Sequence, residues 1–99
     1  MDVVKVARAL SDPLRYTILK RIAQNDTGCC TPDSVEPGVC VCHLVDGMGI
    51  GQSKVSYHIK ELKEAGLIRE ETRGKWNYYA LREDVLREYL AAVSTEFEL

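Results

Sequence analysis

The hydrophobic positions of the first 23 residues recur at helical spacing and predict two helices in succession. The first covers residues 2–10, with a stripe made of Val3, Val6, Ala7 and Leu10. Ser11-Asp12-Pro13 then supplies a capping residue and a proline at the first helical position, where the missing N–H costs nothing. The second helix carries its stripe on Leu14, Ile18 and Ile22, widened by Tyr16 and Leu19.

The pattern stops over residues 24–39, where Asn, Asp, Thr, Gly, two prolines and a pair of cysteines occur. This composition predicts a loop. A loop of this length is uncommon inside a compact domain and is usually functional or disordered. Because it holds half of the chain's cysteines, a functional loop is the better interpretation.

Two further helical stretches follow, separated by glycines. Residues 40–48 predict a short helix with Leu44, Val45 and Met48 facing inward. Residues 52–65 predict a longer helix, whose buried stripe is Val55, Ile59 and Leu62 and whose C-cap is Gly66. Two helices joined by a glycine-containing turn are typical of a helix-turn-helix.

After Gly66 the pattern predicts strands over residues 67–71 and 76–81, joined by a turn at 72–75. The second strand alternates aromatic residues, so we expect some of Trp76, Tyr78 and Tyr79 in the core. A closing helix follows from about residue 83 to 94, with Val85, Leu86, Tyr89, Leu90 and Val93 on its stripe. A hairpin directly after a helix-turn-helix is a wing. The predicted fold class is therefore mainly α with a small β-hairpin (α+β), a single winged helix-turn-helix domain over residues 1–99.

Length and composition limit the function classes. A chain of 99 residues buries a modest core, so a permanent dimer would help its stability. The apolar runs are far shorter than the roughly 20 residues needed to span a bilayer, and the first residues lack a signal-peptide pattern. We therefore expect a cytoplasmic protein with no membrane contact. An enzyme is not expected, because the chain offers no nucleophile–base pair with a plausible pocket and is too short to enclose a substrate.

The distribution of charge matters more than its total. The net charge of −2 argues mildly against nucleic acid. However, residues 52–76 carry 6 basic and 4 acidic side chains, whereas residues 1–51 carry 5 and 6 and residues 77–99 carry 2 and 5. The positive balance thus lies in one segment, as a local DNA-binding face requires. The same balance is also compatible with an ordinary solvated surface.

The outward residues of the helix at 52–65 cluster in its first two turns, the part of a recognition helix that enters the major groove. They are Gln52, Ser53, Lys54, Ser56, Tyr57 and Lys60. Glutamine and serine can bond base edges, while Lys54, Lys60, Arg73 and Lys75 can meet phosphates. His58 is either a DNA contact or a capping or packing histidine. A solvated helix face and a winged-helix module that binds protein are the alternatives, and the order of elements favours double-stranded DNA.

Four segments of the chain carry a resemblance to a known family. They are residues 9–15 (Ala-Leu-Ser-Asp-Pro-Leu-Arg), residues 52–62, residues 64–68 followed by 73–79, and residues 40–44 (Cys-Val-Cys-His-Leu). In this order they resemble the opening, the recognition helix, the turn into the wing and the ion-binding motif of ArsR/SmtB repressors. Gly51 departs from the family's usual capping serine, and residues 26–39 lengthen a connection that is usually short.

The resemblance implies a homodimer bound to an inverted-repeat operator. Its interface would be built from the first and last helices. The residues expected there are Val3, Val6, Leu10, Leu86, Tyr89, Leu90 and Val93.

The chain has four cysteines within 14 residues, Cys29, Cys30, Cys40 and Cys42. In a cytosolic chain such a cluster indicates metal binding or redox chemistry. Thiolates select soft ions such as Cd(II), Zn(II), As(III), Sb(III) or Pb(II). On an ideal helix, Cys40 and Cys42 would point about 200° apart. Binding one ion would therefore need a late or distorted helix start, which suggests that ion capture disturbs the support of the recognition helix.

The resemblance implies As(III) or Sb(III) as the inducer, held by three thiolates, with a third sulfur from the loop. Cd(II) or Pb(II) could use all four sulfurs. Zinc is less favoured, because the resemblance implies that zinc-sensing members use acidic and histidine ligands on the last helix. The closing helix of this chain offers Asp84 and Glu88 but no histidine. His43 is a fifth candidate ligand, although a surface or DNA-proximal role suits it better. A thiol–disulfide redox sensor and cysteines without a special role are the alternatives.

Overall fold

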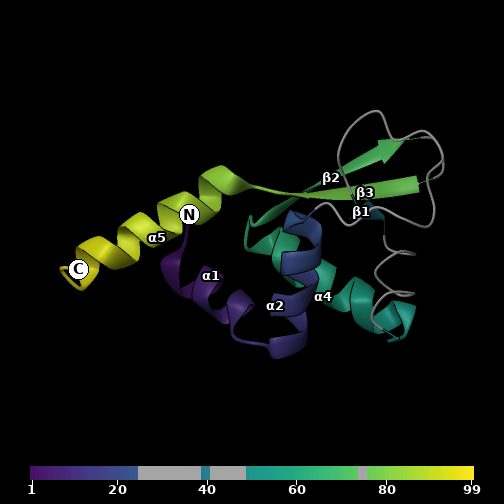
Figure 1. Ribbon diagram of the computed structural model, residues 1–99, viewed down its shortest axis with the longest axis horizontal. Coiled ribbons are helices and arrows are strands. Elements are labelled where there is room, and N and C mark those ends of the chain that lie inside the picture. Colours follow the sequence, from purple (N-terminus) through teal and green to yellow (C-terminus); the bar gives the residue numbers. More distant parts are fainter. Residues whose placement is uncertain (25–38, 41–48, 74–75) are drawn as a thin grey trace.

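Four helices and three strands make up the described part of the chain. The computed structural model describes residues 1–24, 39–40, 49–73 and 76–99. The elements are α1 (Val3–Leu10), α2 (Pro13–Ala23), β1 (Val39–Cys40), α4 (Gln52–Glu64), β2 (Ile68–Arg73), β3 (Trp76–Leu81) and α5 (Glu83–Glu96) (Figure 1). This order confirms the two opening helices, the recognition helix, the hairpin and the closing helix. The rest of the predicted helix at 40–48, residues 41–48, lies outside the described residues.

Carboxylate caps fix where the first two helices begin. Asp2 caps α1 through Oδ1, which accepts hydrogen bonds from the backbone N–H groups of Val4 and Lys5. Asp12 caps α2 in the same way, at 2.9 Å from Leu14 N and 3.0 Å from Arg15 N. These bonds, the one from Arg15 first, hold the pKa of the Asp12 carboxyl below its usual value. Pro13 follows as the first helical residue, as predicted.

Gly66 ends α4 and turns the chain into the hairpin. Its φ of 80° lies in the left-handed region, which glycine adopts without steric cost. The Gly66 N–H donates to the Lys63 carbonyl at 2.9 Å, and the Leu67 N–H donates to the Leu62 carbonyl at 3.1 Å. This pair of bonds is a Schellman motif, and its two leucines are fully buried. The predicted C-cap is therefore confirmed.

The sheet has three strands, one more than predicted, in the order β1-β3-β2 with antiparallel neighbours. We expected a loop up to Val39 and a helix from Cys40. Instead these residues form β1, in which Val39 pairs with Tyr79 and Cys40 with Tyr78. The reason is that the second edge of β3 would otherwise leave its backbone groups unpaired. The strand β2 also runs further than predicted, because its pairing with β3 continues to Arg73.

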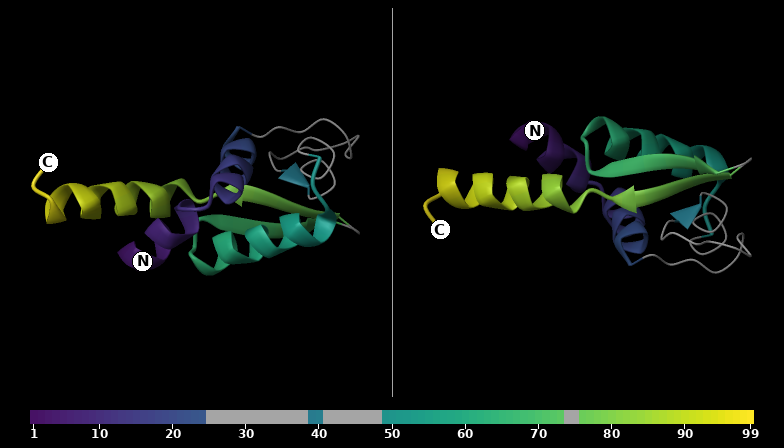
Figure 2. Two further views of the ribbon diagram at one scale, coloured as in Figure 1. Left: turned by 90° about the horizontal axis from the view of Figure 1, so that it is seen from below. Right: turned by 90° about the horizontal axis from the view of Figure 1, so that it is seen from above.

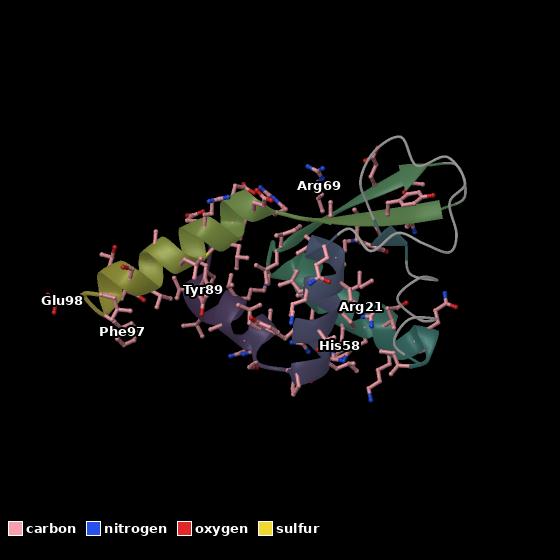
Figure 3. The ribbon with its side chains drawn as sticks, viewed as in Figure 1. Arg21, His58, Arg69, Tyr89, Phe97 and Glu98 are labelled. Atoms are coloured by element: carbon pink, nitrogen blue, oxygen red, sulfur yellow. The ribbon has the colours of Figure 1, made fainter. Side chains whose placement is uncertain are left out.

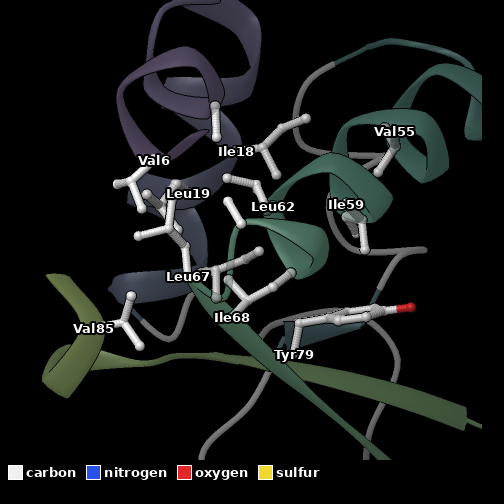
Figure 4. Packing of buried hydrophobic residues seen from close by; sticks show 13 residues of the cluster. Val6, Ile18, Leu19, Val55, Ile59, Leu62, Leu67, Ile68, Tyr79 and Val85 are labelled. Carbon is white, nitrogen blue, oxygen red and sulfur yellow. The ribbon is translucent and has the colours of Figure 1, made fainter. Parts of the chain in front are cut away.

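One core joins α1, α2, α4 and the hairpin. Its largest fully buried side chains are Val6, Ile18, Val55, Leu62 and Leu67, which are labelled in Figure 4, and Ile22. Tyr79 is also part of this core, which confirms that an aromatic residue of the second strand enters it, and Tyr78 is buried outside this cluster. Because these contacts fix α4 against α2 and the hairpin, the opposite face of α4 is held at the surface.

The helix α5 extends away from this core, opposite to the direction of the hairpin (Figures 1 and 2). The principal dimensions are 46 × 27 × 18 Å. Val85 is buried at the start of α5, while Leu90 and Phe97 further along are 61% and 70% exposed. An apolar stripe therefore lies largely uncovered on this helix. None of the described helices has the length and apolar character needed to cross a membrane.

The two glycines that bound α4 should respond oppositely to substitution. Gly66→Ala is expected to lower the free energy of unfolding by roughly 1–2 kcal/mol, because a Cβ is strained at a positive φ. Gly51 caps α4 at φ −66° with open space around it, so Gly51→Ser should instead stabilise by a few tenths of a kcal/mol. Urea unfolding at one fixed protein concentration measures both. Equal destabilisation by the two substitutions would contradict the Schellman geometry.

Candidate nucleic-acid interface

The two faces of α4 differ sharply. Val55, His58, Ile59 and Leu62 are buried on one side. All six residues predicted to point outward are exposed: Gln52, Ser53, Lys54, Ser56, Tyr57 and Lys60. The exposed side combines hydroxyl, amide and ammonium groups at the beginning of the helix, which can hydrogen-bond base edges and phosphates.

His58 is a correction to the predicted DNA-contact set. Its exposed fraction is only 3%, and it lies where α4 meets α2 (Figure 3). Nδ1 accepts a hydrogen bond from Nε of Arg15 at 3.1 Å. The structure thus favours the packing alternative, because the i+3 spacing from Val55 turns His58 toward the core.

Burial lowers the pKa of His58 below 6.5. The negative charge of Asp12 opposes this effect, while the positive charge of Arg15 adds to it. The hydrogen bond requires an unprotonated Nδ1, so the neutral imidazole carries its proton on Nε2.

Arg15 is a residue that the sequence reasoning missed. It is 7% exposed, and the buried stripe of α2 consists of Arg15, Ile18, Leu19 and Ile22. The predicted stripe included Leu14, which is only partly buried, and left out Arg15, which is buried. The i, i+3, i+4, i+7 spacing of these four residues was the available signal, but an arginine was not considered as a member of an apolar stripe.

A second missed cluster connects the wing to α4. Glu70 on β2 accepts hydrogen bonds from Lys63 Nζ at 2.9 Å and from the Tyr79 hydroxyl at 2.7 Å. These bonds, the one from Tyr79 first, lower the pKa of Glu70, whereas burial and the neighbouring carboxylate raise the pKa of Tyr79. Glu70 and Tyr79 are direct cross-strand partners in the observed register. The predicted turn at 72–75 would instead have placed Glu70 opposite Asn77, so the contact was missed. The cluster fixes the wing relative to the C-terminal turn of α4.

The predicted phosphate contacts of the wing are placed only in part. Arg73 is the last residue of β2 and pairs with Trp76. The side chain of Arg73 and the whole of Lys75 lie outside the described residues. Their contacts with phosphates stay predictions.

Of the four predicted sulfur ligands, the described part of the chain includes one. Cys40 lies on β1 opposite Tyr78, whereas Cys29, Cys30, Cys42 and the alternative ligand His43 lie outside the described residues. Because Cys40 is in an extended strand, the 200° separation expected on an ideal helix does not apply to it. The described residues contain no group of three or more His, Cys, Asp or Glu side chains that could hold a metal ion.

The predicted dimer residues divide into three groups. Val6 is fully buried within the protomer, which corrects its assignment to an interface, because the side chain has no surface left for a partner. Leu90 is exposed, and Val3, Leu10, Leu86, Tyr89 and Val93 are partly exposed. An apolar groove of about 310 Å³ runs between α1, α2 and α5, with Leu10, Leu19, Leu86, Tyr89 and Leu90 among its lining residues. Tyr89 lies on the side of α5 that faces α1 (Figure 3).

Comparisons with known proteins agree with this arrangement. Residues 36–70 match the family described as "Bacterial regulatory protein, arsR family". An uncharacterised HTH-type transcriptional regulator of Methanocaldococcus jannaschii is 30% identical over 89 residues, which cover 90% of this chain and 88% of that protein. The arsenical resistance operon repressor of Bacillus subtilis is 36% identical over 77 residues, covering 78% of this chain and 63% of the repressor. The cadmium resistance transcriptional regulatory protein CadC homolog of Staphylococcus aureus is 30% identical over 88 residues. The aligned region covers 89% of this chain and 64% of that protein.

Solved structures share the fold. An ArsR-like transcriptional regulator from Rhodococcus sp. RHA1 superposes with a TM-score of 0.75 at 18% identity, covering 97% of this chain and 82% of that one. The homodimeric winged helix-turn-helix DNA-binding domain of Mb0332 from Mycobacterium bovis, a possible ArsR-family regulator, gives 0.69 at 26% identity, with 97% and 79% covered. These proteins are transcriptional regulators rather than enzymes. The chain belongs to the arsR family of bacterial regulatory proteins and is a transcriptional repressor with a winged helix-turn-helix DNA-binding fold.

Proposed function

We propose that this repressor binds an inverted-repeat operator as a homodimer in the cytoplasm and releases it when As(III) or Sb(III) binds its cysteine thiolates. The observation that carries the proposal is the position of Cys40. It lies on a strand that is paired directly with the wing, at the start of the chain segment that leads into α4. A thiolate site that includes Cys40 is therefore joined by backbone to both DNA-binding elements.

The surface of α4 supports the DNA contacts. The six exposed polar residues of the predicted contact set lie in the N-terminal two thirds of the helix, where Gly51 caps it without a side-chain hydrogen bond. The first N–H groups of the helix are therefore open to a backbone phosphate. Lys54 and Lys60 add positive charge on the same helix, and Gln52 and Ser53 provide groups for base edges.

Release follows from competition between two geometries. Soft ions bind thiolates strongly, and As(III) is satisfied by three of them. Capture of an ion by Cys40, Cys42 and a cysteine of the loop draws together chain segments that flank β1. The strand pairing and the placement of α4 that suit DNA then become the less populated state.

A homodimer is supported by the uncovered stripe of α5 and the apolar groove beside it. A second copy of the chain would cover Leu90 and the partly exposed Leu86 and Tyr89. The structurally similar Mb0332 domain is homodimeric. Two recognition helices related by twofold symmetry match an inverted repeat.

A Cd(II)- or Pb(II)-responsive repressor is the second candidate. It is favoured by the similarity to the cadmium regulatory protein homolog over 88 residues and by a set of four sulfurs, which suits larger ions. A repressor controlled by thiol–disulfide exchange would use the same cysteines without an ion.

The DNA contacts predict a loss of affinity that depends on salt. A duplex enriched from a random library by the unaltered protein serves as the probe. Lys60→Gln should weaken binding and reduce the slope of log K against log salt concentration by about one, because one phosphate contact is lost. Lys5→Gln on α1 removes an equal charge outside the predicted contact set and serves as the control. Equal effects of the two substitutions would show that only the total charge matters.

The sulfur site predicts release that depends on the cysteines. With this duplex, the Cys40→Ser, Cys42→Ser double variant should bind DNA as the unaltered protein does and should no longer dissociate on adding arsenite. Side-by-side titrations with As(III), Sb(III), Cd(II) and Pb(II), followed by release and by thiolate absorbance, identify the inducer. Arsenite release of the double variant would refute the site. Release by peroxide alone would favour the redox alternative.

The proposed dimer interface predicts that a charge on the apolar stripe of α5 weakens association of the two protomers. Leu90→Lys should weaken the dimer by at least about ten-fold in dissociation constant, because it places a charge on the apolar stripe. Sedimentation equilibrium measures the change. Glu88→Lys introduces the same side chain at an exposed position of α5 outside that stripe and should leave association unchanged. A Leu90→Lys protein that remains as dimeric as this control would disprove the proposed interface.

A further inference from the structure

The contact between α2 and α4 contains a buried positive charge. Arg15 is 7% exposed, and the ion pairs given for the described residues do not include it, although the carboxylate of Asp12 on the same helix interacts with it electrostatically. A charged group taken out of water without a carboxylate in direct contact needs other polar partners. The partners of Arg15 therefore indicate what this charge does.

Those partners are two adjacent residues of α4 and one carbonyl of α1. Nε donates to Nδ1 of His58 at 3.1 Å, and the guanidinium carbon lies 5.7 Å from the centre of the Tyr57 ring. Nη1 lies 3.5 Å from the Arg8 carbonyl oxygen, a long hydrogen bond. The rings of Tyr57 and His58 meet edge to face, with centres 5.1 Å apart. One guanidinium thus holds both rings.

Tyr57 carries this contact to the surface. Tyr57 is 54% exposed and belongs to the outward face of α4, whereas His58 is almost fully buried. Adjacent residues on a helix point about 100° apart. Fixing both rings at once therefore fixes the rotation of α4 about its axis as well as the direction of the Tyr57 ring.

We infer that Arg15 is a positioning residue for DNA recognition: it sets the rotation of α4 and the orientation of Tyr57 through His58 and the Tyr57 ring, without touching DNA itself. This inference rests on the proposed DNA contacts of α4. It gives a buried residue of α2 an indirect part in base recognition.

The state of His58 controls this contact. Nδ1 can accept the Arg15 N–H only while the imidazole is neutral. The charged groups around it are Asp12 and Arg15 from α2 and Lys54 and Glu61 from α4, and burial has the largest effect on its pKa. Protonation would turn the acceptor into a donor facing a second cation. The contact is therefore intact above the ordinary histidine pKa of 6.5 and is lost as pH falls through the lower value in the folded protein.

A purely structural role is the competing explanation, because the bond to the Arg8 carbonyl ties α1 to α2. Loss of stability alone would then follow from any substitution of Arg15. A double-mutant cycle separates the two roles, since it removes effects that do not pass through the second residue.

The test is a cycle of Arg15→Gln and Tyr57→Leu, measured as affinity for the enriched duplex at pH 7.5. Each single variant should bind about ten-fold more weakly, and the double variant should lose clearly less than the product of the two losses. The salt slope of Arg15→Gln should match that of the unaltered protein, because no phosphate contact is removed. Arg87→Gln, an exposed arginine of α5, is the control for loss of charge and should bind normally.

A second readout does not involve DNA. Nitrogen NMR of the free protein should show His58 with an unprotonated Nδ1 and a pKa below 6.5, and Arg15→Gln should raise that pKa. Tyr57→Leu changes an exposed residue and should fold, so the cycle retains one informative arm if Arg15→Gln is unstable. In that case Arg15→Lys, which keeps the charge but not the planar geometry, takes its place.

The outcomes distinguish this inference from the function on which it rests. If the unaltered protein enriches no duplex, the proposed DNA contacts are wrong and the inference falls with them. If it binds and Arg15→Gln binds equally, or if the losses multiply, the positioning role is wrong while the DNA contacts stand. A salt slope reduced by about one in Arg15→Gln would instead make Arg15 a direct phosphate contact.

Discussion

The arrangement of this repressor depends on complete burial of one face of α4. Val55 and Leu62 have no exposed surface, and Ile59 has almost none. Each fully buried aliphatic side chain contributes roughly 1.5–3 kcal/mol relative to an exposed one, so a small domain loses much of its stability if α4 rotates. The same burial forces the polar residues of α4 outward. The constraint that stabilises the fold is thus also the constraint that presents the proposed DNA-binding face.

Sequence periodicity was sufficient for the elements that obey this constraint. Val55, Ile59 and Leu62 identify α4 because an amphipathic helix repeats its apolar residues every three to four positions. Asp12-Pro13 and Gly66 mark helix ends because they meet local requirements of the backbone. These signals depend on neighbours in the chain, and they were confirmed.

Contacts between distant segments were harder to predict. Strand β1 has only two residues, too few for a period, and it forms because β3 offers a free edge more than 30 positions away. Val6 is on the predicted interface stripe, yet it is buried within the protomer because α2 and α5 both pack against α1. Arg15 was not considered as a buried residue and His58 was left open between a DNA contact and a packing role, because the burial of each depends on the other. The hydrophobic pattern of one helix therefore cannot predict the burial of a polar residue whose hydrogen-bond partner lies on another helix.

The three strands and two side-chain clusters, Lys63–Glu70–Tyr79 and Arg15–His58–Tyr57, connect the helices and the hairpin. Cys40 is paired with Tyr78 on β3, and the neighbouring Tyr79 bonds to Glu70, which bonds to Lys63 on α4. On the other side of α4, Arg15 links α2 to His58 and Tyr57. The recognition helix is therefore held at its first half by α2 and at its last turn by the wing. In the proposed mechanism, a change at β1 is transmitted to α4 through the contact with the wing, while the contact with α2 is kept. The response expected from this arrangement is a change in the angle between α4 and the wing rather than unfolding, and it would prevent the two elements from meeting DNA together.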